Sequence, residues 1–388
     1  MHGALTAIAT GIGWALLGLS LVGSLYMVAA ALTLRRFFAR TEVPLRRSDG
    51  VTILKPLHGA EPRLADNLAS FLAQEHDGPI QLLCGVQRGD DPAIAAVEAL
   101  KARFPQARID LIVDATPHGA NSKVANLLNL EPHIDHDVVV LSDSDMVARP
   151  TYLAGLLAAL DRPGTGAVTL IYHGRGDAGF WSRLAAAGLS WQFLPGAVFG
   201  AAHGLARPCM GSTIAMRRGT LAAIGGFQAF ADVLADDYAI GEAVAAQGLE
   251  VTMPPMLVAH ASIERSLGEL WRHELRWGAT VRDVVPLAYM MGVIGIPFPL
   301  ALLALPMHPL LGFIFAALAL LARLLVALAA DRVAGTRTAP LWLLPVRDCL
   351  TFAVFVASLT VRSVDWRGAT LRMEKHGRIS AKAEISVP

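Results

Sequence analysis

Two carboxylates one residue apart follow a short apolar run in the first half of the chain. The run is Val138–Leu141, and the acids are Asp143 and Asp145. Such a run is typical of a buried strand, and residues at its carboxyl end face the crevice in which open α/β sheets bind ligands. Carboxylate oxygens suit Mg²⁺ or Mn²⁺ carrying a diphosphate. We therefore predict Asp145 as a direct metal ligand and Asp143 as a contact to both metal and nucleotide; a turn with two solvated acids is the alternative.

A second acidic site is predicted near residue 237. Asp237 follows Asp236 and precedes Tyr238 at the start of an Ala-rich helical run. A carboxylate beside a metal-bound diphosphate could take the proton from an attacking hydroxyl group, so Asp237 is the candidate general base. Helix capping is the alternative function for this residue.

Further acids follow the first two predicted strands. Asp90 and Asp91 come after the strand at 80–86, and Glu61 comes after the strand at 51–54. Asp91 precedes Pro92, which suits a helix N-cap as well as a ligand contact.

Basic and aromatic residues complete the candidate site. Lys123 lies near the amino end of a predicted helix that begins at Asn121, where anions bind favourably. His273, Arg276 and Trp277 lie on a later helix, and Arg276 could neutralise a leaving diphosphate. The alternatives are a solvated lysine and a helix that only lies in a membrane interface.

Alternating strands and helices must position these residues. The pattern predicts strands at 51–54, 80–86, 109–113 and 138–141, with helices at 64–73, 92–103 and 121–130 between them. Strands that alternate with helices imply right-handed crossovers and a mostly parallel, doubly wound sheet. The chain has no Gly-x-Gly-x-x-Gly after the first strand and no P-loop, which disfavours a dinucleotide enzyme or a P-loop ATPase.

The amino-acid composition indicates that the chain also contains membrane-spanning segments beside this α/β domain. Hydrophobic residues make up 54% of the 388 residues and charged residues 17%, which is unusual for a soluble protein. Residues 12–34 form an uncharged stretch long enough to cross a bilayer, and Arg35 and Arg36 follow it directly. The positive-inside rule then places the amino terminus outside and the following domain in the cytoplasm. A cleaved signal peptide is the rival, but its basic residues would precede the apolar core.

Three more apolar stretches follow the domain. Residues 284–305 and 310–330 have spanning length, whereas 341–359 is interrupted by Arg347 and Asp348. Because a full fourth crossing would leave the basic tail outside, we expect the last stretch to be re-entrant or interfacial. A net charge of +1 gives no case for nucleic-acid binding, and three scattered cysteines argue against a zinc site or a disulfide framework.

Six short motifs, taken in chain order, resemble those of the processive-type family 2 glycosyltransferases. More narrowly, they resemble the ceramide glucosyltransferase family with its D, DxD, D and (Q/R)xxRW signature, and within it the bacterial hopanoid-biosynthesis-associated branch. The resemblance covers residues 51–277 and rests on Lys55-Pro56-Leu57-His58-Gly59, Val86-Gln87 with Asp90-Asp91-Pro92, Asn121-x-Lys123, Asp143-Ser144-Asp145, Asp237-Tyr238 and Arg276-Trp277.

The resemblance implies roles for individual residues. Asp237 would be the general base, Asp145 and Asp143 the metal ligands, and His273, Arg276 and Trp277 would close over the diphosphate and acceptor. His273 stands where the signature has glutamine or arginine, so Arg272 is an alternative there. The implied nucleotide-sugar contacts are Pro56, Glu61, Asp90, Asp91, Asn121, Lys123 and Asp143.

The resemblance also implies an architecture and a reaction. We expect an α/β fold of the GT-A type, with a Rossmann-like, mostly parallel sheet at 48–265. An N-terminal membrane helix with its basic flank would occupy 1–40, an interfacial helix 266–283, membrane helices 284–361 and a basic cytoplasmic tail 362–388. The enzyme would be a multi-pass protein of the bacterial inner membrane whose catalytic domain faces the cytoplasm.

The expected reaction is metal-dependent sugar transfer with inversion. N-acetylglucosamine would move from UDP-GlcNAc to a bacteriohopanepolyol in hopanoid biosynthesis, or glucose from UDP-glucose to ceramide. Two functions of other classes stay open: a membrane transporter that uses Arg323, Arg347 and Asp348 as charges on a substrate path, and a non-catalytic nucleotide-binding scaffold.

Overall fold

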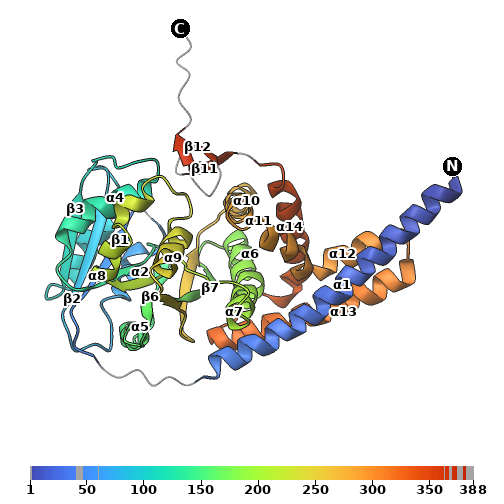
Figure 1. The fold of residues 1–388 in the computed structure, drawn as a ribbon, viewed down its shortest axis with the longest axis horizontal. Coiled ribbons are helices and arrows are strands. Elements are labelled where there is room, and N and C mark those ends of the chain that lie inside the picture. The colour runs from blue at the N-terminus through green and yellow to red at the C-terminus, as the bar shows by residue number, and fades with distance from the viewer. Residues whose placement is uncertain are drawn as a thin grey trace, which may run out of the picture.

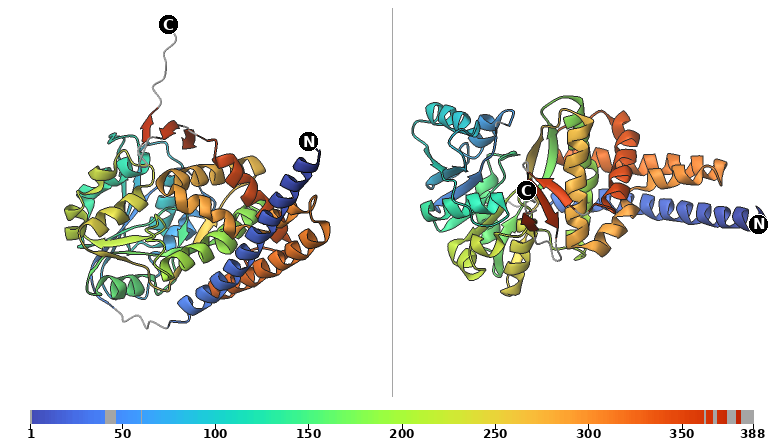
Figure 2. Two further views of the ribbon diagram at one scale, coloured as in Figure 1. Left: turned by 45° about the vertical axis from the view of Figure 1, so that its right-hand side comes forward. Right: turned by 90° about the horizontal axis from the view of Figure 1, so that it is seen from above.

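The protein consists of an α/β domain and a helical stalk that projects from it (Figures 1 and 2). The computed structural model describes residues 2–40, 47–59, 61–361, 363–366, 369–373 and 379–381. We call the helices α1 (His2–Phe38), α12 (Pro297–Ala304) and α13 (Pro309–Ala334) the stalk. Between the stalk and the domain lie five more helices: α6 (Phe180–Gly188), α7 (Leu194–Ala202), α10 (Leu267–Val284), α11 (Pro286–Met291) and α14 (Leu344–Ser358) (Figure 1).

The domain is built on a seven-stranded sheet with the order β3-β2-β1-β4-β8-β6-β9. The first four strands in this order are parallel, and β8 is antiparallel to both of its neighbours. The strands are β1 (Val51–Pro56), β2 (Ile80–Val86), β3 (Arg108–Val113), β4 (Val138–Leu141), β6 (Thr165–Thr169), β8 (Ile214–Arg217) and β9 (Glu250–Thr252). The predicted mostly parallel α/β sheet is confirmed.

Helices cover both faces of this sheet because its strands are apolar on both sides. Within β4, Val138 and Val140 join the core that packs against α2, α3 and α5, whereas Val139 and Leu141 join the core against α4, α8 and α9. The helices are α2 (Leu64–Ala69), α3 (Ala93–Arg103), α4 (Ser122–Leu130), α5 (Tyr152–Leu160), α8 (Arg218–Ala223) and α9 (Asp236–Ala246). Burial on both sides makes β4 the rigid base of the Asp-x-Asp segment.

A second sheet has three strands and packs against helix α6. Its order is β5-β10-β7, formed by β5 (Met146–Val147), β10 (Leu257–Ser262) and β7 (Ile171–Gly176). Helix α6 (Phe180–Gly188) packs on β7 and continues through a π-helical turn, η2 (Leu189–Phe193), into α7 (Leu194–Ala202). Helix α10 (Leu267–Val284) occupies the segment for which an interfacial helix was predicted, and Ser266 caps its first turn by accepting the Glu269 N–H at 3.2 Å.

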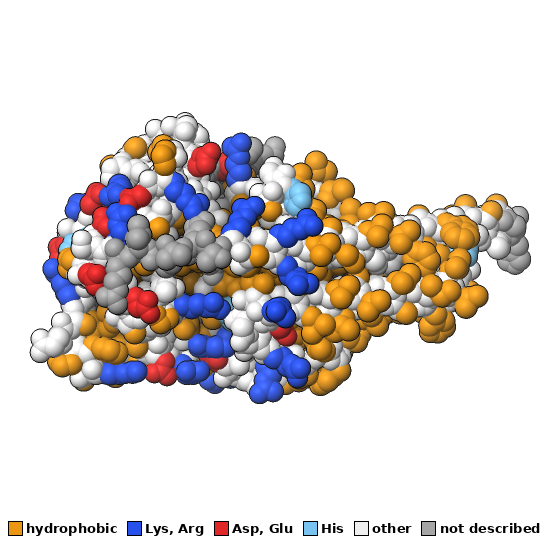
Figure 3. All heavy atoms as spheres, turned by 90° about the horizontal axis from the view of Figure 1, so that it is seen from below, with side chains coloured by type: hydrophobic (Ala, Val, Ile, Leu, Met, Phe, Trp, Pro, Cys, Tyr) orange, Lys and Arg blue, Asp and Glu red, His pale blue; other side chains and the backbone are white. Residues whose placement is uncertain are grey.

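The stalk presents an apolar surface. It consists of α1 (His2–Phe38), α12 (Pro297–Ala304) and α13 (Pro309–Ala334), with α1 packed along both of the others. Large apolar side chains such as Leu25 and Phe313 are more than 60% exposed on it. Figure 3 shows these side chains over the stalk and lysines and arginines gathered where the stalk meets the domain. The stalk therefore has the surface of a membrane-inserted segment.

Within the described residues, four helical segments could cross a membrane by length and composition, or five if a bent helix pair at 286–304 counts as one span. They cover Ala4–Phe38, Phe180–Ala202, Pro309–Ala334 and Leu341–Ser358. The second was not predicted from sequence, and it packs against β7 inside the protein. At 1.5 Å per residue, α1 and α13 measure about 55 and about 39 Å, enough to span a hydrocarbon core.

The apolar segment predicted at 284–305 is bent in the structure. The chain breaks there into α11 (Pro286–Met291), η4 (Gly292–Gly295) and α12, with a 68° bend. Pro297 and Gly295 lie at the break, and proline cannot donate the backbone hydrogen bond that a continuous helix requires. The segment therefore enters the stalk as a short helix after a sharp turn.

The last apolar stretch forms η5 (Leu341–Leu343) and α14 (Leu344–Ser358). Helix α14 packs chiefly on α10 rather than along α1. The remaining short elements are η1 (Glu131–His133), η3 (Phe227–Phe230), β11 (Ser363–Trp366), β12 (Ala369–Met373) and β13 (Ile379–Ala381). Most of the predicted basic tail lies outside the described residues.

Candidate active site

The Asp-x-Asp segment leaves the carboxyl end of β4 beside the carboxyl end of β1. The Asp143 N–H donates to the Gly211 carbonyl at 3.3 Å, and Ser144 Oγ donates to Glu61 Oε1 at 2.6 Å. His260 Nε2 lies 3.1 Å from Asp145 Oδ2. The structure therefore brings Glu61, predicted from its place after β1, into direct contact with the segment.

A buried lysine donates hydrogen bonds to the Asp-x-Asp segment and to the residue before it. Lys55, at the end of β1, is fully buried and donates to Ser142 Oγ and to the Asp143 carbonyl, both at 2.9 Å. Its ammonium group also lies 3.4 Å from the centre of the Phe71 ring. The motif Lys55-Pro56 was noted in the sequence, but Lys55 was given no role there. Pro56 itself is buried at the end of the strand, paired with Gly85.

Lys123 lies between two acids that are far apart in sequence. Its Nζ is 2.9 Å from Asp143 Oδ1 and 3.2 Å from Asp236 Oδ2. Asn121 caps the same helix by accepting the N–H groups of Lys123 and Val124, and its Nδ2 donates to the Val233 carbonyl at 2.6 Å. The cap fixes the first turn of α4, and the ion pairs join that turn to the start of α9.

Asp237 faces the same space from the first turn of α9. Its Oδ2 accepts the Gly211 N–H at 2.9 Å and its Oδ1 accepts the Tyr238 N–H at 2.8 Å. Gly211 therefore links the predicted base to the Asp-x-Asp segment, because its carbonyl accepts the Asp143 N–H. A Cβ at Gly211 would lie 2.9 Å from both Asp143 Oδ2 and Lys123 Nζ, so the close approach needs glycine.

A row of rings borders Asp145 on the side of α10. The Trp277 ring lies 4.2 Å from that of His273 and 6.0 Å from that of His260, between ring centres. His273 Nδ1 lies 2.6 Å from Glu264 Oε1. Arg276 is half-buried on the same helix. Trp277 is thus separated by one ring, that of His260, from the carboxylate expected to bind metal, and His273 packs against Trp277.

Two predicted contacts have structural surroundings of their own. Asp91 is buried, and it accepts the N–H groups of Gly59 and Ala93 at 2.9 Å, so it caps α3 and holds the turn after β1. Asp90 is exposed and pairs with Arg88 at 2.6 Å, away from the carboxylate cluster. Capping, the alternative for Asp91, is therefore realised, and nucleotide contact by Asp90 or Asp91 stays a prediction.

Burial and mutual repulsion shift the pKa values of the acids. Burial, with the nearby Asp145, raises the pKa of Glu61 to about 7. Burial, with the adjacent Asp236, raises the pKa of Asp237 to about 6 although Lys123 opposes the shift. Burial lowers the pKa of Lys55 to about 7. Such shifted groups, gathered in one place, are typical of a functional site.

The donor set fits a divalent cation. Two buried carboxylate oxygens, Asp145 Oδ1 and Glu61 Oε2, have no hydrogen-bond partner among the described residues. Unpaired buried oxygens of this kind are costly, and they are hard ligands of the type that Mg²⁺ and Mn²⁺ prefer. The described residues form no group of three His, Cys, Asp or Glu side chains suited to hold a metal alone. The site therefore suits a cation that the protein holds together with phosphate oxygens.

Sequence reasoning missed His260, Asp236 and Lys55 as members of this cluster. His260 interrupts the otherwise small and apolar strand β10, and a single ionisable residue in a buried strand was the available signal. Asp236 was noted only as the neighbour of Asp237, yet it is the more buried of the two.

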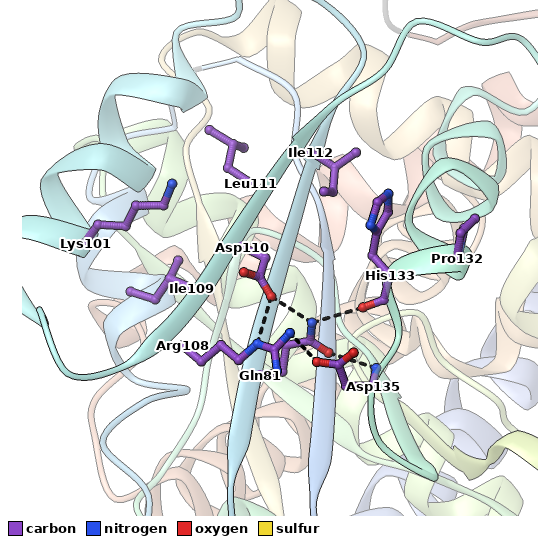
Figure 4. Close-up of a pocket in the computed structure, with 10 residues that line it drawn as sticks. All are labelled: Gln81, Lys101, Arg108, Ile109, Asp110, Leu111, Ile112, Pro132, His133 and Asp135. Atoms are coloured by element: carbon purple, nitrogen blue, oxygen red, sulfur yellow. Dashed lines mark hydrogen bonds and ion pairs between the residues drawn. The ribbon is translucent and has the colours of Figure 1, made fainter.

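The hollow of about 470 Å³ drawn in Figure 4 lies elsewhere in the domain. It borders β3, and residues of the hollow pair with one another: Gln81 Nε2 donates to Asp110 Oδ2 at 2.7 Å, and Arg108 Nε to the same oxygen at 3.2 Å. Arg108 also pairs with Asp135. None of the predicted site residues lines it.

Comparisons with known proteins bear on the family and on the fold. The chain is 26% identical over 269 residues to ceramide glucosyltransferase 1 of Caenorhabditis elegans, covering 65% of this chain and 55% of the worm protein. It is 25% identical over 229 residues to ceramide glucosyltransferase 3 of the same organism, covering 56% and 48%. The chain thus spans about half the length of these curated relatives.

A solved structure shares the fold. The mannosyltransferase PcManGT from Pyrobaculum calidifontis, determined in complex with GDP-Man and Mn²⁺, superimposes with a TM-score of 0.50. At 21% identity, the alignment covers 92% of this chain and 99% of that one. The fold is therefore a glycosyltransferase fold of the GT-A type, as predicted.

The family is shown by a match along almost the whole chain. Residues 15–379 of the 388 match the family described as Glycosyl transferase family 21. The family, the fold and the carboxylate cluster lead to one conclusion: this protein is a glycosyltransferase and belongs to glycosyl transferase family 21.

Proposed function

We propose that the protein transfers a sugar from a UDP-sugar to a hydroxyl group of a membrane lipid, with inversion at the anomeric carbon. The observation that carries this proposal is the connection of Asp237 to Asp143 through the backbone of Gly211, beside Lys123, in a domain attached to an apolar stalk. Such a site would join a nucleotide-sugar donor to an acceptor drawn from the bilayer.

The protein's own residues divide the reaction between them. Asp237 Oδ would accept the proton of the acceptor hydroxyl as its oxygen bonds to the anomeric carbon and the bond from that carbon to the diphosphate breaks. Lys123 and Arg276 would stabilise the charge on the departing UDP. Glu61, Asp91 and Asn121 would shape the nucleotide side, and His273 with Trp277 would close over the diphosphate.

Asp145 and Asp143 would hold Mg²⁺ or Mn²⁺. A cation bound there supplies positive charge beside the diphosphate and so makes UDP a better leaving group. The orphaned oxygen Asp145 Oδ1 supports this assignment, and the Pyrobaculum mannosyltransferase of similar fold was determined with Mn²⁺.

For the substrates, we propose N-acetylglucosamine from UDP-GlcNAc and a bacteriohopanepolyol acceptor in hopanoid biosynthesis. The alternative is glucose from UDP-glucose and a ceramide acceptor, which is the reaction that the names of the worm relatives describe. We further propose that the domain faces the cytoplasm of a bacterial inner membrane, because Arg35 and Arg36 follow the apolar part of α1.

A transporter is the weaker proposal because the charges expected on its path have partners. Arg323 Nε donates to both carboxylate oxygens of Asp348 at 3.0 Å, and the two terminal nitrogens of Arg347 donate to the two carboxylate oxygens of Glu274 at 2.5 Å. Charges that are paired and buried in this way hold helices together, and they are not available to a passing substrate.

The test uses membranes that contain the full chain. They are incubated with UDP-GlcNAc, UDP-glucose or GDP-mannose and with a bacteriohopanepolyol or a ceramide, and the lipid products are identified by mass. A product that carries one hexose or N-acetylhexosamine from a UDP-sugar, absent with the Asp237→Asn variant, supports the proposal. Product formation from GDP-mannose alone, or equal product with the variant, contradicts it.

A further inference from the structure

Helix α10 is joined to α14 by an ion pair between a buried arginine and a partly buried glutamate. Glu274 lies on α10 beside His273, and its two carboxylate oxygens accept hydrogen bonds from the two terminal nitrogens of Arg347, each at 2.5 Å. Arg347 is 2% exposed. A fork of this kind fixes both distance and rotation, which a single contact would not do.

The guanidinium group of Arg347 lies in a slot built for it. Thr351 Oγ1 accepts from its Nε at 3.0 Å and from its Nη2 at 2.9 Å, and the Leu184 carbonyl accepts from Nη1 at 3.3 Å. The slot is closed by Gly188, where a Cβ would come within 3.1 Å of the guanidinium carbon. Side chains and backbone from α6 and α14 thus hold the arginine before it meets α10.

A second arginine joins α10 to α14 near the carboxyl ends of the two helices. Arg282, near the end of α10, donates to the carbonyl of Ser358, the last residue of α14, and, at 2.7 Å, to the carbonyl of Val361, three residues after that helix. Helix α14 therefore holds α10 at two points along its length. The rotation of α10 about its own axis is set by these contacts.

The rotation of α10 about its axis determines the direction of Arg276, the residue proposed to contact the diphosphate. Successive helix residues are about 100° apart, so Glu274 and Arg276 project about 200° apart, on opposite sides of α10. With Glu274 held against α14, Arg276 is turned away from α14. At a side-chain radius of about 5.5 Å, a 20° rotation of α10 would move the tip of Arg276 by about 2 Å. Displacements of about 1 Å can cost 100-fold in rate.

We infer that Glu274 and Arg347 are positioning residues that fix the rotation of α10 and so place Arg276 and Trp277 at the active site. The inference rests on the proposed function in one respect, which is the contact of Arg276 with the diphosphate. Buried ion pairs are weak contributors to net stability, and registry is their best-attested use. The adjacent pair Asp348–Arg323 joins α14 to α13 and not to α10, so it provides a matched control.

The experiment compares two apolar replacements in the full-length protein in lipid nanodiscs. Glu274→Met with Arg347→Met removes the pair that reaches α10, and Arg323→Met with Asp348→Met removes the pair that does not. Replacing both partners avoids leaving a buried charge unpaired, so both double variants should melt near the wild-type temperature. We expect the first to raise KM for the UDP-sugar and Kd for UDP at least tenfold, and the second to change each constant less than twofold.

A double-mutant cycle with Arg276→Gln separates positioning from other causes. Arg276→Gln should weaken UDP binding at least tenfold in the wild-type background and less than threefold in the Glu274→Met, Arg347→Met background, because Arg276 is already misplaced there. Equal losses in the two backgrounds overturn the positioning inference and leave the proposed role of Arg276 standing. No loss in the wild-type background overturns that role instead. If the double variant fails to fold, Glu274→Gln, which keeps the shape and removes the charge, takes its place in the same cycle.

Discussion

Replacing Asp237 by asparagine tests the chemistry most directly. The carboxylate accepts two backbone N–H groups, from Gly211 at 2.9 Å and from Tyr238 at 2.8 Å. Asparagine has one carbonyl oxygen, so one N–H loses its acceptor, at a cost of about 1–3 kcal/mol. Removing the charge beside the buried Asp236 offsets part of that cost. We therefore expect the variant to fold, with a small change in melting temperature.

The effect on rate should be much larger than the effect on stability. A positioned general base contributes about 10²- to 10⁴-fold to a reaction, which is about 3–5 kcal/mol of barrier. Asp237→Asn should therefore lower kcat by at least 100-fold while UDP still binds in the presence of Mn²⁺ or Mg²⁺. The assay measures glycolipid product by mass and UDP binding by calorimetry.

The pH profile gives an independent reading of the same residue. Burial and the adjacent Asp236 raise the pKa of Asp237 to about 6, above its usual 3.8. Below pH 6 the carboxyl group is protonated and cannot accept a proton, so wild-type kcat/KM should fall about tenfold per pH unit there. The sign for stability is opposite: between about pH 6 and 4 the folded form binds this proton more readily than the unfolded chain, so protonation favours the fold. Loss of rate in this window should therefore occur in folded protein.

A matched control comes from the same loop. Asp232 is exposed and also accepts a distant backbone N–H, that of Ala120 at 2.9 Å, but it lies outside the carboxylate cluster. Asp232→Asn should leave kcat within twofold of wild type. If Asp237→Asn turned over normally, or if Asp232→Asn lost as much activity, the assignment of Asp237 as the base would be refuted.

Three further predictions concern the surroundings of this base. Lys123→Met leaves Asp143 and Asp236 without their cation and should lower the free energy of unfolding by about 3 kcal/mol, measured by thermal denaturation; an unchanged melting temperature would contradict the buried pairing. Gly211→Ala places a Cβ 2.9 Å from Asp143 Oδ2 and should cut kcat/KM at least tenfold with little loss of stability, and unaltered kinetics would show that the close approach is not needed. Chelation of divalent cations by EDTA should abolish transfer, and added Mn²⁺ or Mg²⁺ should restore it; full activity in EDTA would exclude the proposed metal dependence.

Local patterns predicted the fold well where the contacts that stabilise an element are near in sequence. Strands β1 to β4 and the helices between them were predicted within a few residues, because apolar periodicity and capping residues such as Asn121 act over one or two turns. The same local chemistry allowed Asp91 to be considered as a cap, which it is. The break near Pro297 was missed because average hydropathy over a window of spanning length does not register a bend.

The site was predicted only in part because its remaining contacts join distant segments. Lys55 meets Asp143, His260 meets Asp145, and Lys123 meets Asp236 across separations of about 90 to 115 residues, which no local pattern specifies. Their types alone give a weak signal, since a lysine at a strand end is usually solvated. What places them is the tertiary arrangement: β1 and β4 end side by side in the seven-stranded sheet, and β10 of the second sheet brings His260 to Asp145.

The role of charged residues within the apolar stretches also could not be predicted from the sequence. In sequence, Arg323 and Arg347-Asp348 favour either a transport path or a segment unable to cross the membrane, because an unpaired charge is costly in hydrocarbon. In the structure each charge has a buried partner: Arg323 pairs with Asp348, and Arg347 with Glu274. In the sequence, a charged residue that lines a transport path looks the same as a charged residue that joins two helices through an ion pair. Only its partner in the structure distinguishes the two cases. Because one of the partners lies on the helix that carries Arg276 and Trp277, these residues connect the apolar segments to the active site.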